Sequence, residues 1–365
     1  TFQWSNEGKG VAAVHCVIVG FSYSSLEIKH LFSLDAVARK QTKIVCDNIN
    51  PYLTNAPSVI ISSNNYIVSQ EVPMMNGSKP SDGGFLLLSK EEKEKLLYEE
   101  PLAYKYLRPF LGADEFINRK ERWCLWFADA DLKQLSSDLE SMPLCLERIK
   151  NVKLNREASE YQTSVGSHLR PHEFERIRQP KQGHYLIIPS VSSENRKYVP
   201  IGFLDSKTIT SNLAFTIPNA SLYHFGILNS SMHNAWMRTV AGRLKSDYRY
   251  SSTIVYNSFP FPYLATERSE NNATPQILKS VEIIETKAQA ILNARIKYEQ
   301  EAIENAQKVP SLADLYRVSL IDTYPELTKA HKDLDKAIDA AYGYKDKDDD
   351  ASRVAFLFDR YNQLK

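Results

Sequence analysis

The stretch Tyr185-Leu-Ile-Ile-Pro-Ser-Val-Ser-Ser-Glu-Asn-Arg-Lys-Tyr-Val-Pro-Ile-Gly-Phe203 has a polar centre between two apolar runs. The runs at 185–189 and 199–203 are short, rich in β-branched and aromatic residues, and separated by polar, turn-forming residues. This pattern predicts two strands joined by a polar loop, as in a β-ribbon. The loop is therefore the first candidate for a functional surface.

Two charged residues in this loop, Glu194 and Arg196, alternate along the chain. On an extended segment they would point to one side. A carboxylate can accept a hydrogen bond from cytosine N4, and a guanidinium can donate two to guanine O6 and N7. Together they could recognise one C·G pair in a major groove, and a surface salt bridge is the alternative.

The segment from about 44 to 265 has the same pattern of short apolar runs separated by turn-forming residues. Further short β-like runs at 58–62 and 214–217 alternate with turns rich in Pro, Gly and Asn. Two helical stretches interrupt them, one opened by a capping box of Ser89 and Glu92 and one at 222–240. We expect an α+β domain with many loops.

The residues before this domain include a continuous apolar run, Val11-Ala-Ala-Val-His-Cys-Val-Ile-Val-Gly-Phe21. Such a run predicts a strand covered on both faces, as in the middle of an α/β sheet. One strand cannot form a sheet, so its partners must lie upstream or in the next segment. Because the chain starts at Thr1 and enters the strand almost at once, we expect a piece of something longer.

From Pro275 onward the pattern is helical. One apolar stripe has spacings of four and three residues, and a second ends near Gly343. Asp350 could cap a last helix. These stripes predict a packed helical bundle, and the residues of the two stripes are Ile277, Val281, Ile284, Ala288, Ile291, Leu327, Leu334, Ala337, Ile338 and Ala341.

The composition is that of an ordinary globular protein of two or three domains. The 365 residues carry a formal net charge of +1, with 24% charged and 43% hydrophobic residues. This excludes a disordered polyelectrolyte, a collagen-like chain and a coiled-coil rod. Four widely spaced cysteines indicate reduced thiols, and neither a signal sequence nor a membrane span is evident, so we expect a cytoplasmic protein.

The sequence offers little evidence for a catalytic or metal site. Neither the G-x-G-x-x-G nor the P-loop pattern is present. His168 and His172 are spaced as metal ligands on a helix, but Arg170-Pro171 breaks that helix, so no metal site is expected. Asp129 and Asp131 would share a strand face, although a solvated loop is the simpler interpretation. Asn50-Pro-Tyr52 is only a partial match to an Asn-Pro-Pro-Tyr loop.

Basic residues are concentrated in three segments despite the neutral total. The richest one interleaves basic and aromatic residues with hydroxyls, a composition that suits phosphate contacts. Ordinary surface charges are the alternative. The three groups are Arg238, Arg243, Lys245 and Arg249; Arg148, Lys150, Lys153 and Arg156; and Arg170, Arg176, Arg178 and Lys181.

Long stretches of the chain resemble one known family, the MmeI-like (type IIL) DNA adenine methyltransferases of restriction–modification systems. The resemblance covers roughly residues 1–262 and concerns the C-terminal part of that family. The matching stretches are Phe2-Gln-Trp-Ser-Asn6, Gly10-Val-Ala-Ala-Val-His-Cys-Val-Ile-Val-Gly-Phe21, Ile49-Asn-Pro-Tyr-Leu53, Gly77-Ser-Lys-Pro-Ser-Asp-Gly-Gly84, Lys105-Tyr-Leu-Arg-Pro-Phe-Leu-Gly112, Arg119-Lys-Glu-Arg-Trp-Cys-Leu-Trp126, Ile177-Arg-Gln-Pro180, Val191-Ser-Ser-Glu194, Ser230-Ser-Met-His-Asn-Ala-Trp236, Gly242-Arg-Leu-Lys-Ser-Asp-Tyr-Arg-Tyr-Ser251 and Tyr256-Asn-Ser-Phe-Pro260.

The resemblance implies an α+β fold class: a mixed α/β target recognition domain, a C-terminal helical bundle and the remnant of a class I methyltransferase sheet at the N-terminus. Residues 1–24 would be the terminal strands of the methyltransferase domain and 25–44 a linker. Residues 45–265 would be the target recognition domain and 266–365 the C-terminal helical domain. The family transfers a methyl group from S-adenosylmethionine to adenine N6, but the cofactor motif and the Asn-Pro-Pro-Tyr loop are not in this sequence.

The family's base-contacting residues match the stretch that contains Glu194 and Arg196, in agreement with the C·G hypothesis. Tyr198 stands where relatives can have another basic residue, so the neighbouring base preference is open. The resemblance also implies contacts to the DNA backbone from three residues: Arg243, Lys245 and Arg249.

We therefore expect a DNA-recognition fragment whose partners are double-stranded DNA and the absent methyltransferase domain, with no membrane. The fragment alone would hold no cofactor and be inactive, whereas the parent enzyme would use S-adenosylmethionine. A stand-alone DNA specificity subunit is the alternative. A complete enzyme with an unrecognised site near His168 or Asp129 is a third, weaker hypothesis.

Overall fold

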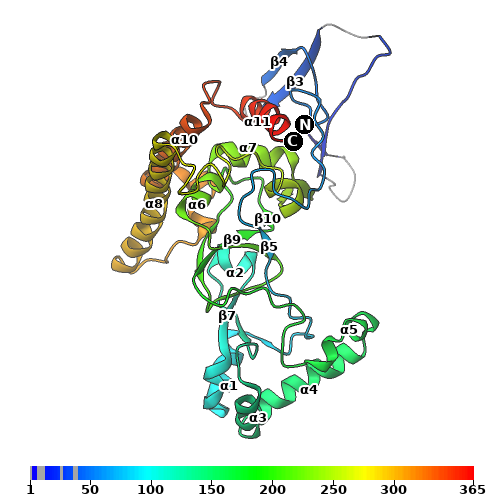
Figure 1. Ribbon diagram of the computed structural model, residues 1–365, viewed down its shortest axis with the longest axis vertical. Helices are drawn as coiled ribbons and strands as arrows, with labels where there is room; N and C mark the ends of the chain where they lie inside the picture. Colours follow the sequence, from blue (N-terminus) through cyan, green and yellow to red (C-terminus); the bar gives the residue numbers. More distant parts are fainter. Residues whose placement is uncertain (1, 6–12, 25–27, 36–39) are drawn as a thin grey trace. The chain divides into compact units, whose positions relative to one another are not determined.

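A computed structural model describes residues 2–5, 13–24, 28–35 and 40–365 (Figure 1). The chain forms two compact units. Unit 1 comprises Thr1–Glu71, Ser230–Ser280 and Asp335–Lys365, and unit 2 comprises Val72–Asn229 and Val281–Leu334. Among the helices of the described ranges, none is long and apolar enough to cross a membrane.

Unit 2 contains a four-stranded sheet in the order β11-β9-β13-β5. Its central strand β9 pairs antiparallel with β11, where Ile187 lies opposite Gly202, and antiparallel with β13, where Ile188 lies opposite Phe215. Side chains from Tyr185 onward are buried, as expected of an apolar run in the middle of a sheet. The strands are β5 (Met75–Asn76), β9 (His184–Pro189), β11 (Gly202–Asp205) and β13 (Ala214–Pro218).

A second sheet of unit 2 has the order β12-β7-β8-β6 and lies against a cluster of helices. Leu86, Leu125 and Val152 are completely buried in its core. Ser89 and Glu92 form the predicted capping box at the start of α1. The elements are β6 (Leu87–Leu88), β7 (Leu107–Leu111), β8 (Trp123–Leu125), β12 (Ile209–Thr210), α1 (Lys90–Glu99), η1 (Pro101–Tyr106), α2 (Ala113–Asn118), α3 (Leu132–Glu140), α4 (Pro143–Glu157), α5 (Glu160–Ser164) and η2 (Ser167–Leu169).

The predicted C-terminal helices are present, and they belong partly to each unit. Ile284 and Ala288 of the predicted stripe pack against Gly226, where an added Cβ would lie 2.9 Å from Ile284 and 3.3 Å from Ala288. Gly226 therefore allows α6 to pack closely against α8 within unit 2. The helices are α6 (Leu222–Leu228), α8 (Pro275–Glu304), α9 (Leu312–Leu315), η4 (Val318–Thr323) and α10 (Pro325–Tyr342).

Unit 1 is centred on Trp236 of α7, which is fully buried. The Trp236 ring lies 5.5 Å from the ring of Phe358 in α11, and its indole N–H donates to the carbonyl of Val255. The remaining elements are β1 (Phe2–Ser5), β2 (Ala13–Cys16), β3 (Lys29–Asp35), β4 (Lys40–Cys46), β10 (Val191–Ser192, in unit 2), α7 (Ser231–Val240), β14 (Gly242–Leu244), β15 (Asp247–Arg249), the π-helical turn η3 (Ser252–Tyr256) and α11 (Asp350–Leu364).

Several local predictions from the sequence are wrong in detail. The helical stretch 222–240 is two helices, because the Ser230 side chain accepts from the His233 N–H and starts α7 as a new helix. Asp349, not Asp350, caps α11. Residues 58–62 form no strand.

The N-terminal apolar run differs from the expected buried strand. Its strand β2 ends at Cys16 and pairs antiparallel with β1. Beyond it Ile18 and Phe21 are 84% and 91% exposed. An apolar run is buried only where other elements cover it, and here these side chains contact solvent. Val11 and Ala12 lie outside the described residues.

The range 25–44, expected to be a linker, contains most of an antiparallel hairpin. Strands β3 and β4 pair along their whole length, with Lys29 opposite Cys46 and Asp35 opposite Lys40. Residues 25–27 and 36–39 lie outside the described part of the chain.

Candidate nucleic-acid interface

Residues 190–201, here called the 190–201 loop, connect β9 to β11 and include the short strand β10. The sequence predicts this polar connection, but the second strand, expected at 199–203, begins only at Gly202. The centre of the loop is a turn, in which the Arg196 N–H donates to the Ser193 carbonyl at 3.2 Å and the Asn195 N–H to Ser193 Oγ at 3.3 Å. Glu194 and Arg196 are half-buried and Asn195 is exposed. Glu194 and Arg196 therefore lie in a turn and not on an extended strand, so the alternation of a strand does not set the directions of their side chains.

Tyr198 has a different environment from its neighbours in the loop. Its side chain is 3% exposed, and its ring stacks on His331 with centroids 4.1 Å apart and planes 16° apart. A direct contact between Tyr198 and a base would require this stack to open. The Tyr198 side chain therefore points into unit 2, although its backbone belongs to the loop.

The β14/β15 hairpin of unit 1 carries the three basic residues assigned to backbone contacts. Arg243, Lys245 and Arg249 are all exposed. Lys245 starts the two-residue turn with a left-handed φ of 56°. Arg243 lies opposite Tyr248, its guanidinium carbon is 3.8 Å from the ring centroid, and its Nη1 donates to the Ser246 carbonyl at 2.7 Å. The hairpin therefore presents three cations, one of them held in place by an aromatic ring.

Buried polar groups lie next to this hairpin in unit 1. Tyr250 is 5% exposed and its hydroxyl is 2.9 Å from His233 Nε2. Burial lowers the pKa of His233 to about 3, so its imidazole is neutral. The Arg238 side chain forms an ion pair with Asp350 at 2.6 Å. Arg238 is thus engaged with α11, unlike the exposed cations of the hairpin.

Three other basic residues of the sequence clusters are bound to groups of the protein itself. Arg156 is fully buried, and its five N–H donors bond to five backbone carbonyls at 2.8 to 3.0 Å. The side chain of Arg170 pairs with Glu173, and that of Arg176 pairs with Glu175. Charge density along the sequence consequently overestimates the charge available to a polyanion.

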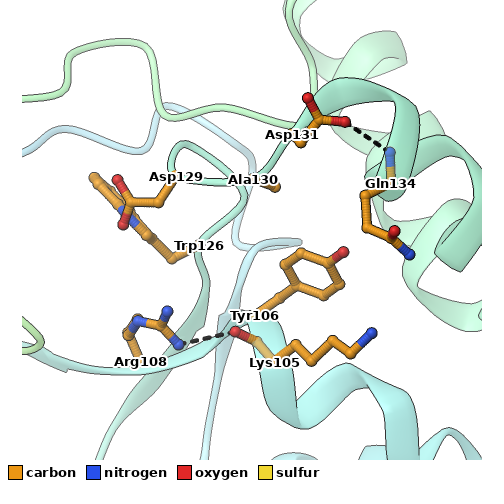
Figure 2. A pocket seen from close by; sticks show the side chains of 8 residues that line it. All are labelled: Lys105, Tyr106, Arg108, Trp126, Asp129, Ala130, Asp131 and Gln134. Atoms are coloured by element: carbon orange, nitrogen blue, oxygen red, sulfur yellow. Dashed lines mark hydrogen bonds between the residues drawn. The ribbon is translucent and has the colours of Figure 1, made fainter.

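A cavity of about 210 Å³ opens in unit 2 between β7 and the start of α3 (Figure 2). Asp129, which the sequence offered as half of an acidic pair, accepts from the Trp126 indole at 2.8 Å. Asp131 accepts from the backbone N–H groups of Lys133 and Gln134 as the N-cap of α3. The two carboxylates thus have separate structural roles.

This cavity does not suit S-adenosylmethionine. It is smaller than the roughly 300–1,000 Å³ of typical small-molecule sites. Two cations, Lys105 and Arg108, and two carboxylates, Asp129 and Asp131, line it, so the volume and not the charge of the cavity is the argument against this cofactor. Within the described ranges no group of three His, Cys, Asp or Glu side chains could hold a metal ion.

Two family models match the chain. The MmeI target recognition domain matches residues 55–263, and the MmeI C-terminal domain matches residues 278–365. The chain belongs to the MmeI family. The MmeI target recognition match contains the 190–201 loop and the β14/β15 hairpin, and therefore all six residues assigned to DNA contacts.

Individual relatives agree with the MmeI assignment. The chain is 35% identical over 364 residues to DNA methyltransferase A of Bacillus subtilis (strain 168), a match that covers 100% of this chain and 38% of that protein. It is 42% identical to the type IIL restriction-modification enzyme MmeI, whose structure was solved in complex with DNA. That match has a TM-score of 0.83 and covers 100% of this chain and 45% of the other. The chain thus spans less than half the length of these relatives.

Two contacts of the candidate residues could not be foreseen from the sequence. The position of Tyr248 under Arg243 depends on the register of the hairpin. The stack of Tyr198 on His331 joins distant segments, and no local pattern indicates it.

Proposed function

We propose that this chain is the sequence-specific DNA-recognition part of an adenine-N6 DNA methyltransferase of the restriction–modification type. The supporting observation is the MmeI target recognition match over residues 55–263, which includes an exposed cationic hairpin and a polar turn. The DNA in the solved MmeI complex supports DNA as the partner.

Glu194 and Arg196 are the proposed base contacts. Both lie at the turn of the 190–201 loop, and both are half-buried, which limits the conformations of two long side chains. In the major groove the carboxylate would accept from cytosine N4 and the guanidinium would donate to guanine O6 and N7. Recognition of one C·G pair is the proposed result.

Arg243, Lys245 and Arg249 are the proposed backbone contacts. Their cations would neutralise phosphates and release counterions, which strengthens binding without regard to sequence. Unit 1 would therefore contribute affinity through the hairpin, while the loop in unit 2 contributes discrimination between base pairs.

Methyl transfer is proposed for the complete enzyme, with S-adenosylmethionine supplying the methyl group to adenine N6. Because the target atom lies inside the duplex, the adenine has to be flipped into a catalytic pocket. The role of this chain would be to place that pocket over one adenine by binding the surrounding base pairs. The cofactor and the catalytic loop would belong to the methyltransferase domain of the parent protein.

A stand-alone DNA specificity subunit is the second candidate, because the two family models that match describe a target recognition domain and a C-terminal domain. The gene distinguishes the two. A reading frame continuous with Thr1 that encodes an Asn-Pro-Pro-Tyr loop would exclude the subunit.

The base assignment is tested by sequencing the methylated sites of the complete enzyme. Exchange of Glu194 and Arg196 for another pair should change one position of the recognition site and leave the others unchanged. Loss of one contact should cost about 1–3 kcal/mol of discrimination. An unaltered recognition site in the exchanged variant would disprove the assignment.

A further inference from the structure

Three buried residues of the C-terminal helical region, Arg295 in α8, Tyr316 at the end of α9 and His331 in α10, form a chain of hydrogen bonds that reaches the 190–201 loop. Arg295 Nε donates to the Tyr316 hydroxyl oxygen at 3.0 Å, and Nη2 of the same guanidinium also bonds to it. Tyr316 Oη lies 2.8 Å from His331 Nε2. All three side chains belong to unit 2 and are at most 6% exposed.

The direction of these bonds follows from which atoms can donate. An arginine only donates, so the Tyr316 oxygen is the acceptor of both guanidinium bonds. Its single proton is then available for His331 Nε2, which has to be unprotonated. Burial and the nearby positive charges of Arg295 and Lys197 lower the pKa of His331 well below its usual value, in agreement with a neutral ring.

Both ends of this chain of bonds hold the second half of the loop. At one end, Arg295 Nη1 donates to the Ile201 carbonyl at 2.7 Å, one residue before β11 begins. At the other end, the His331 ring stacks on the Tyr198 ring, with the two ring centroids 4.1 Å apart. Tyr198 is two residues beyond Arg196. The turn with Glu194 and Arg196 is thus connected to α8 and α10 through Tyr198 and Ile201.

We propose that Arg295, Tyr316 and His331 are positioning residues that determine base specificity through the 190–201 loop without touching DNA. This inference rests on the proposed role of Glu194 and Arg196. Hydrogen bonds weaken steeply when donor and acceptor are misaligned, and a bidentate contact to guanine needs both donors in register. A small displacement of the loop would therefore weaken discrimination at one base pair and leave phosphate contacts unchanged.

The experiment that tests this proposal compares the variant Tyr316→Phe with the control variant Tyr324→Phe. Tyr316→Phe removes the hydroxyl that joins Arg295 to His331 and keeps the ring. Tyr324→Phe makes the same chemical change in unit 2 at a tyrosine that packs edge-on against Tyr298. Each protein is used to select duplexes from a library with a randomised centre, and the bound duplexes are sequenced at several salt concentrations.

We expect Tyr316→Phe to lower the preference at the base pair assigned to Glu194 and Arg196 by at least about 5-fold. Preferences at other positions and the salt dependence should equal those of the unchanged protein and of Tyr324→Phe. His331→Phe, which keeps an aromatic face against Tyr198 but removes the acceptor, should produce the same single-position loss. The unfolding temperature of each variant separates this effect from loss of folded protein.

Two results would overturn the inference in distinguishable ways. If the unchanged protein showed no base preference at any position, the proposed function would fail and the inference with it. If the unchanged protein preferred certain base pairs, and Tyr316→Phe and His331→Phe kept that preference in full at every position, only the positioning role would fail. A uniform loss at all positions would also contradict it, because that result indicates a general defect of folding or affinity.

Discussion

The guanidinium carbon of Arg243 lies 3.8 Å from the ring centroid of Tyr248, its cross-strand neighbour in the β14/β15 hairpin. The ring holds a long side chain in one place while its charge remains exposed, and cation–π contact of this kind stabilises by about 0.5–1 kcal/mol at exposed sites. A cation that is ordered in advance loses less entropy on meeting a phosphate.

Removing one hairpin cation should weaken DNA binding uniformly across sequences. For Arg243→Ala we expect the slope of log affinity against log salt concentration to fall in magnitude by about 1, as for one lost phosphate contact. Fluorescence anisotropy with duplexes of different sequence measures this slope. Lys279→Ala, at an exposed lysine of α8 in the same unit, is the control and should leave it unchanged. An unaltered slope for Arg243→Ala would place the DNA contacts elsewhere.

The role of Tyr198 can be separated into its ring and its hydroxyl. Because the ring is buried against His331, Tyr198→Phe should keep the base preference of the protein and cost at most about 1 kcal/mol of stability. Tyr198→Ala removes the stack and should cost about 3 kcal/mol. Duplex selection and urea unfolding measure the two effects. A base preference that changes in Tyr198→Phe would instead establish a direct contact from the hydroxyl.

These examples show which parts of the structure could be predicted. The stripe through Ile284, Ala288 and Ile291 and the capping box at Ser89 depend on residues within one or two helical turns, so the sequence pattern indicates them. The direction of the Tyr198 ring depends on His331, which lies far along the chain. Glu194 and Arg196 stand next to Tyr198 in the sequence, and this adjacency alone grouped the three residues as base contacts.

Arg156 shows that the burial of a charged residue is equally hard to predict from the sequence. It is the last basic residue of a cluster on α4, where the sequence suggests a phosphate contact. Its exposure is decided by the backbone of distant segments, whose carbonyls surround it. Lys153, three residues earlier on the same helix, has a side chain 54% exposed.

Replacing the Arg156 guanidinium should destabilise unit 2 strongly. Arg156→Met would leave five carbonyl oxygens without their donor in a fully buried site, at a cost of about 3 kcal/mol or more. Arg156→Lys keeps the charge with fewer donors and should lose less. Lys153→Met, at an exposed position of α4, should change the unfolding free energy by less than about 0.5 kcal/mol. Equal urea midpoints for Arg156→Met and Lys153→Met would contradict this account.

The buried His233 should make stability depend on pH. Its pKa is lowered to about 3 by burial, whereas in the unfolded chain it should be close to 6.5. The unfolded state therefore binds a proton first as the pH falls, and the stability that is present above pH 6.5 is lost progressively between pH 6.5 and about 3. His331, whose pKa is also lowered by burial, acts with the same sign.

A histidine variant isolates this contribution between pH 7 and 5, where most carboxylates remain ionised. Between these values the unchanged protein should lose about 2 kcal/mol more unfolding free energy than His233→Gln. His184→Gln, at an exposed histidine of β9, should follow the curve of the unchanged protein. Urea unfolding at a series of pH values gives the three curves. Parallel curves for the unchanged protein and His233→Gln would show that His233 binds a proton equally well in the folded and unfolded states.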